Sequence, residues 1–203
     1  MSALLILANY GSSIYAFPIT DNITISVGTL VYCAFMMTTV LFVIIERDVG
    51  VIKGIIRLLI SVNLFLVVLS MTISWTLSNP AIHNLFDTST DIFNVSLLVT
   101  SIGGVVTISE LIALIYLFER IKSRVSNPIA VSSLYIVSFV TIICLDGLVF
   151  PLVINPFSGH LISDLKSGVT GNFIMAVGYG TPMLMILVLF RKRLVQYMNQ
   201  PLF

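Results

Sequence analysis

Six stretches of about 20 apolar residues constrain this chain more than any other feature, because an α-helix needs that length to cross the hydrocarbon core of a bilayer. Only 9% of the residues are charged and the mean hydropathy is +1.09, so lipid is the expected solvent. The first stretch is the weakest, because Asn9, Tyr10 and Gly11 interrupt it. The sequence predicts an all-α integral membrane protein with a single domain over residues 1–203. Its six transmembrane helices are expected at about 3–20, 24–45, 54–77, 94–118, 129–154 and 169–190.

The distribution of the cationic side chains predicts the orientation. Nine of the ten Lys and Arg fall in three groups: around the second loop, in the fourth loop and after the last span. Lys166 alone lies on the other side of the membrane. The positive-inside rule makes the three groups cytoplasmic. Both termini are therefore expected in the cytoplasm, and the bacterial cytoplasmic membrane is the expected location.

Motifs of known chemistry are missing from the sequence. It has no metal-ligand spacing, no Ser-His-Asp set, no phosphate-binding loop and no haem motif, and His83 and His160 stand alone in outer loops. A net charge of +1 gives no basis for nucleic-acid binding. We therefore expect no enzymatic activity, no metal, no cofactor and no nucleic-acid partner, whereas homo-oligomerisation stays open.

Two carboxylates lie inside predicted spans, Glu110 in the fourth and Asp146 in the fifth. Each costs about 2.5–3.5 kcal/mol near a helix centre on insertion scales, and helix packing rarely requires such a cost. We predict that both acids face a shared central cavity that binds a small molecule. Asp146 has two candidate roles, as a hydrogen-bonding anchor for the ligand or as a proton site that couples transport to a proton gradient. Gly147 and Pro151 would let its helix open there.

Uncharged polar side chains are expected in the same cavity. Asn9 of the first span, and Asn172 and Tyr179 of the sixth, are the candidates. Asn172 and Tyr179 are seven residues apart and share one helix face.

The sixth span also carries a predicted helix break. Pro182 cannot donate a hydrogen bond to the carbonyl of Gly178, and Gly180 adds backbone freedom. A membrane tolerates such a break only where protein or a water-filled cavity meets the freed polar groups. Breaks of this kind are typical of transporter binding sites.

Short segments across nearly the whole chain resemble the vitamin uptake proteins, a six-span family that includes the bacterial queuosine-precursor transporters. The segments are "ANYGSS" (8–13), "SVGTLVYCAFMMTTVLFVIIERDVG" (26–50), "SELIALIYLFERIKSR" (109–124), "CLDGLVF" (144–150) and "GYGTPMLMIL" (178–187). The matching residues are Asn9, Gly50, Phe118, Asp146, Phe150, Thr181 and Pro182.

The chain also departs from the family pattern. The family's acids of span two fall on Val43 and Arg47, its acid of span four falls near Leu114, one turn from Glu110, and its Lys of span six is replaced by Asn172. The resemblance therefore implies the architecture more directly than the substrate. The implied ligand is a deazapurine such as 7-cyano-7-deazaguanine, whose amino-keto edge suits acids and amides. Trp75 or Tyr179 could stack on such a ligand.

Three functions fit these observations. The first is uptake of a small heterocyclic solute, with queuosine precursors among the candidates. The second is a non-transporting membrane sensor that passes its signal through the basic segment "RKRLVQYMNQPLF", which could lead into an output domain. The third is the substrate-capture subunit of a multi-subunit vitamin importer, which would require partner subunits.

Overall fold

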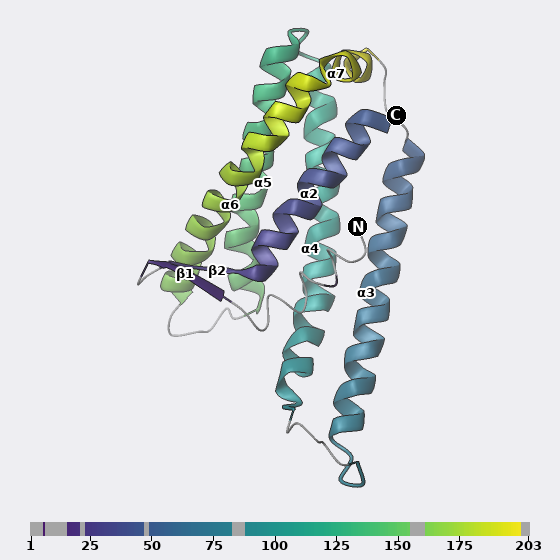
Figure 1. Ribbon diagram of the computed structural model, residues 1–203, viewed down its shortest axis with the longest axis vertical. Helices are drawn as coiled ribbons and strands as arrows, with labels where there is room; N and C mark the ends of the chain where they lie inside the picture. The colour runs from purple at the N-terminus through teal and green to yellow at the C-terminus, as the bar shows by residue number, and fades with distance from the viewer. Residues whose placement is uncertain are drawn as a thin grey trace.

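The computed structural model describes residues 6, 16–20, 23–46, 49–82, 88–154 and 161–199. Within these residues, five helices are long and apolar enough to cross a membrane (Figure 1). They confirm the predicted all-α membrane class and correspond to the second through sixth predicted spans. These helices are α2 (Val27–Glu46), α3 (Val49–Leu77), α4 (Asp91–Lys122), α5 (Pro128–Ile154) and α6 (Leu161–Leu189). A short helix, α7 (Arg191–Met198), follows α6 at an angle.

The end of the first predicted span is a strand, which makes the prediction of a helix through residue 20 wrong. β1 (Ala16–Thr20) pairs antiparallel with β2 (Ile23–Ser26), and the register is irregular after Pro18. Proline removes a backbone donor, and the β-branched residues that follow favour extended backbone. The second span accordingly begins at Val27 rather than 24. Asn9 and most of the first span lie outside the described residues.

The helices pack into a core between α2, α4, α5 and α6. The most extensive contact joins α5 and α6, and α3 packs mainly on α4 at the edge of the bundle (Figure 1). Phe35, Leu114, Phe139 and Met183 are fully buried in this core. Large apolar side chains are exposed on the outer faces, as expected where lipid replaces water as the neighbour.

Two glycines bring α5 and α6 into backbone contact. A Cβ atom on Gly147 would lie 2.7 Å from the carbonyl oxygen of Gly168, and one on Gly168 would lie 2.7 Å from that of Gly147. Small residues are the usual means by which membrane helices approach closely. Helix α5 is continuous through Gly147 and Pro151, so Gly147 serves close packing in a helix that does not open there.

The predicted break in the sixth span is wrong. Helix α6 runs without interruption from Leu161 to Leu189 and includes Pro182. Proline removes one hydrogen bond, while the turns on either side keep theirs. The carbonyl that loses its donor belongs to Gly178, one turn before Pro182.

The orientation in the membrane remains a prediction, and the fold supplies its test. Ile162 lies 84% exposed at the start of α6, and Ser123 lies exposed after α4, at the opposite end of the bundle. In a chain whose Cys33 and Cys144 are replaced by Ser, we expect a membrane-impermeant thiol reagent added outside intact cells to label Ile162→Cys but not Ser123→Cys. Labelling of Ser123→Cys alone would show that the orientation is the opposite of the predicted one.

Candidate ligand-binding site

Four helices each contribute one polar side chain to a cluster inside the bundle, here called the acid cluster: Tyr32, Glu110, Asp146 and Asn172. Glu110 of α4 and Asp146 of α5 are close enough for their charges to interact. Tyr32 of α2 donates its hydroxyl to Glu110 Oε2. Asn172 of α6 donates Nδ2 to Asp146 Oδ2 over 3.2 Å and to the carbonyl oxygen of Ile143 over 2.9 Å. The bundle therefore joins residues that lie up to 140 positions apart, which is the separation between Tyr32 and Asn172 (172 minus 32).

The glycine contact fixes the geometry of this cluster. Asp146 immediately precedes Gly147, and Asn172 lies one helical turn after Gly168. Because the two glycines hold the backbones of α5 and α6 together, the short side chains of Asp146 and Asn172 can reach each other. Asn172 is 4% exposed, so its amide is committed to this contact.

A thiol and a second phenol border the acid cluster. Cys33 is fully buried next to Tyr32 and lies within electrostatic range of Asp146, Cys144 and Glu110. Tyr179 lies within electrostatic range of Cys33, which places it at the edge of the cluster. Both thiols are free.

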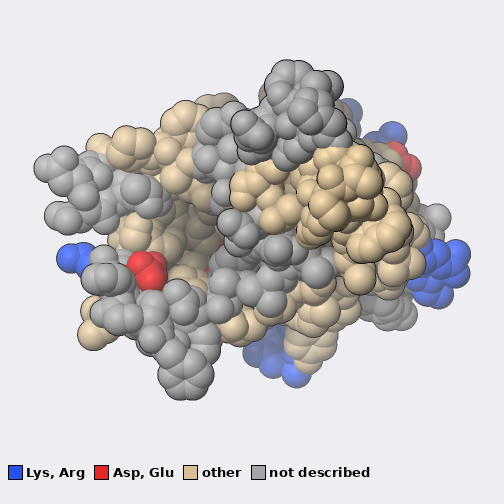
Figure 2. Space-filling view, turned by 90° about the horizontal axis from the view of Figure 1, so that it is seen from below, with Lys and Arg blue, Asp and Glu red and all other residues tan. Residues whose placement is uncertain are grey.

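The carboxylates of the acid cluster have hydrogen-bond acceptors that no donor among the described residues uses. Each carboxylate accepts one hydrogen bond from the described residues, through Glu110 Oε2 and Asp146 Oδ2, so each keeps a second oxygen. Both residues are partly exposed. Figure 2 views the molecule from the end that carries β1 and β2, and it shows a hollowed face with acidic residues at its edge and within it. Such an arrangement can bind a small molecule that donates hydrogen bonds.

The predicted site residues divide into three groups. Glu110, Asp146 and Asn172 are brought together in the acid cluster, and Tyr179 borders it. Trp75 lies elsewhere: its side chain is 74% exposed on α3, the helix at the edge of the bundle. Tryptophan is enriched where membrane helices meet the interface, which accounts for this position better than ligand stacking does. Asn9 lies outside the described residues.

The sequence did not point to Tyr32. A tyrosine in the middle of an apolar span, within "TLVYCAF", is the signal that could have identified it, because a phenol in lipid needs a hydrogen-bond partner.

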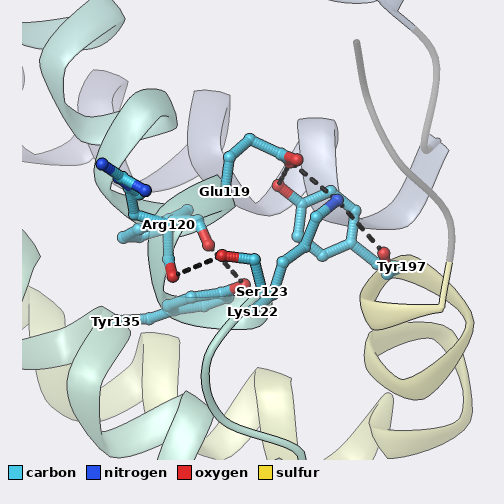
Figure 3. A network of polar contacts seen from close by, with 7 residues as sticks. Glu119, Arg120, Lys122, Ser123, Tyr135 and Tyr197 are labelled. Atoms are coloured by element: carbon cyan, nitrogen blue, oxygen red, sulfur yellow. Dashed lines mark hydrogen bonds and ion pairs between the residues drawn. The ribbon is translucent and has the colours of Figure 1, made fainter.

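A second polar network docks α7 onto α4, and we call it the α7 latch: Glu119, Lys122 and Tyr197 (Figure 3). Lys122 Nζ lies 2.7 Å from Glu119 Oε1 and donates to the backbone oxygen of Tyr197 over 3.3 Å. The ammonium group also lies 4.0 Å from the centroid of the Tyr197 ring. Tyr197 donates its hydroxyl to Glu119 Oε1 over 2.8 Å. Burial raises the pKa of this hydroxyl well above its usual range, as do the nearby Tyr135 and Glu119, so Tyr197 remains a donor.

An aromatic stack next to the latch joins α4 to α5. The rings of Phe118 and Tyr135 are parallel, with their centroids 3.9 Å apart, and the Tyr135 hydroxyl donates to the carbonyl oxygen of Phe118 over 3.3 Å. Sequence inspection does not single out the latch, although the spacing of Glu119 and Lys122 is typical of a helical ion pair.

Comparison with known proteins gives a match at the level of the family. A family model described as a vitamin uptake-like sensor matches residues 1–191, which include all five long helices. No curated protein and no solved structure matches the chain.

Proposed function

Because the chain belongs to the vitamin uptake-like sensor family, with the match covering residues 1–191, we propose that it is a membrane module that senses a small ligand at the acid cluster. The ligand is a heterocycle that offers N–H donors to Glu110 and Asp146. Helix α7 carries the signal out of the membrane domain.

The juxtaposition of Glu110 and Asp146 is the observation that carries this proposal. Two neighbouring carboxylates repel each other when both are ionised, and removal from water adds a further cost. Among the described residues, no Lys or Arg forms an ion pair with either acid, since the ion pair found there joins Lys122 and Glu119. A ligand with an amino group or a protonated ring nitrogen would supply the missing donors through charge-assisted hydrogen bonds.

The sensing function and the uptake function share this site. The sequence favours uptake of a small heterocyclic solute first and a sensor second. The word "sensor" in the family description supports the second, and so does the latch that joins α7 to the same helix as Glu110. A deazapurine with an amino-keto edge remains one candidate ligand.

A binding screen on the purified protein tests the proposal. The panel contains amino-substituted purines, deazapurines, pterins and pyrimidines, and the measurement is the thermal shift followed by calorimetric titration of each hit. For any hit we expect Glu110→Gln and Asp146→Asn each to weaken binding about tenfold to 100-fold, because each loses a hydrogen bond to an ionised group. Asp146→Asn is nearly isosteric and should leave the fold intact.

Glu46→Gln is the matched control, because Glu46 is an exposed acid at the end of α2, outside the acid cluster. It should bind as tightly as the wild type. If the Glu110→Gln/Asp146→Asn double variant bound the hit as tightly as the wild type, neither acid would belong to the binding site. Accumulation of the radiolabelled hit inside proteoliposomes would favour uptake over sensing.

A further inference from the structure

A second hollow lies away from the acid cluster, where α6 meets α7. It has a volume of about 790 Å³. Cationic and apolar side chains line it together: Leu189, Phe190, Arg191, Lys192, Arg193, Val195 and Gln196. Leu189 ends the stretch of α6 that is long and apolar enough to cross a membrane, so the hollow lies at the end of this stretch.

The three cations in this hollow have no anionic partner in the described part of the chain. Arg191, Lys192 and Arg193 are all exposed, and the ion pair found among the described residues joins Glu119 and Lys122 instead. Unpaired cations at the end of a membrane span favour the binding of an anion.

Helix α7 is held with its three basic side chains exposed. Leu194 and Tyr197 are three residues apart on one helix face, and each is 1% exposed. The latch fixes Tyr197 from the α4 side. The basic residues therefore cannot turn into the bundle, and they stay at the membrane boundary beside the apolar end of α6, where Leu189 is 79% exposed.

We propose that this hollow binds the headgroup phosphate of an anionic phospholipid. Arginine side chains bind phosphate oxygens in a bidentate manner, and the lysine adds a third charge. The exposed apolar residues at the end of α6 contact the acyl chains of the same lipid. Basic residues that directly follow a membrane span are known to attract anionic lipids. What distinguishes this site from a diffuse basic surface is the hollow that combines both kinds of side chain.

Lipid binding by three proteins tests the proposal: the wild type, Arg191→Gln/Lys192→Gln/Arg193→Gln, and Lys53→Gln/Arg120→Gln/Arg124→Gln. The last variant removes the same charge from exposed cations outside the hollow, near the same end of the bundle. Native mass spectrometry in detergent measures the affinity for single molecules of dioleoylphosphatidylglycerol and of dioleoylphosphatidylcholine. Inorganic phosphate is added as a competitor.

We expect the wild type to prefer phosphatidylglycerol and the hollow variant to bind it about 100-fold more weakly. The control variant should lose less than about threefold, and millimolar phosphate should not displace the lipid. Equal losses in the two variants would show a diffuse charge effect and overturn the proposal. No preference for phosphatidylglycerol in the wild type would also overturn it, as would displacement by phosphate, which would indicate a site for free anions.

Discussion

Gly147→Ala is expected to lower the free energy of unfolding by about 3 kcal/mol. The added methyl group would lie 2.7 Å from the carbonyl oxygen of Gly168 and 2.9 Å from the amide nitrogen of Val169. These are backbone atoms, so relief requires α5 and α6 to separate along their most extensive contact. Separation would also pull Asp146 away from Asn172, so ligand binding should weaken in the same variant.

Gly178→Ala is the matched control, because a methyl group there meets nothing within 4 Å. It lies on α6 as Gly168 does, and the intrinsic preference of helices for alanine over glycine makes a neutral or slightly stabilising result the expected one. Reversible unfolding in mixed micelles, followed by circular dichroism against denaturant, measures both. Equal stability of the two variants would mean that the glycine contact is not tight in the membrane.

Lys122→Met is expected to release α7 from the bundle. The Lys122 side chain is only 5% exposed, and its removal leaves Glu119 without its cation. Lys122 also contacts α7 directly, through its hydrogen bond to the backbone oxygen of Tyr197 and through the Tyr197 ring. The loss of both contacts is expected to cost about 2 kcal/mol, or about a 30-fold change in the ratio of docked to undocked α7.

Thiol accessibility reports this release. Leu194 is a residue of α7 whose side chain is buried against the bundle. Leu194→Cys should therefore react slowly with a maleimide in a Cys33→Ser/Cys144→Ser background. The reaction should become about 30-fold faster when Lys122→Met is added. Arg124→Met is the control, since Arg124 is an exposed cation two residues along the chain. Equal rates in both backgrounds would assign the docking of α7 to its apolar contacts alone.

The transmembrane helices were predictable because a bilayer sets one length for all of them. The span predicted at 129–154 corresponds closely to α5, whereas α3, α4 and α6 start earlier because residues beyond the hydrocarbon region continue the helix. The same length criterion misjudges residues 16–20, where Pro18 and β-branched neighbours favour a strand. Hydropathy alone does not distinguish a helix from a strand in this segment.

The candidate site was predictable only in part, for a related reason. The cost of an acid in lipid singles out Glu110 and Asp146 without any knowledge of their neighbours. Their partners depend on which helices touch, and the phenol of Tyr32 is a weaker signal in an apolar span than a carboxylate is. Trp75 was ambiguous for a different reason: an aromatic residue suits both a ligand-binding site and the membrane interface, and the sequence does not distinguish the two. The latch likewise depends on the path of α7, which no periodicity in eight residues can define.

Glu110 and Glu119 belong to one unbroken helix, so a movement of α4 at Glu110 is transmitted to Glu119. Nine residues separate them, which is about 13.5 Å along the axis of α4, and half-integral turns place them on roughly opposite sides. If a ligand displaces Glu110 along this axis, the displacement reaches Glu119 undiminished, because a helix resists axial compression. The hydrogen bond from the Tyr197 hydroxyl of α7 to Glu119 is 2.8 Å long and hydrogen bonds extend little beyond 3.2 Å, so a displacement of about 1 Å is enough to break it.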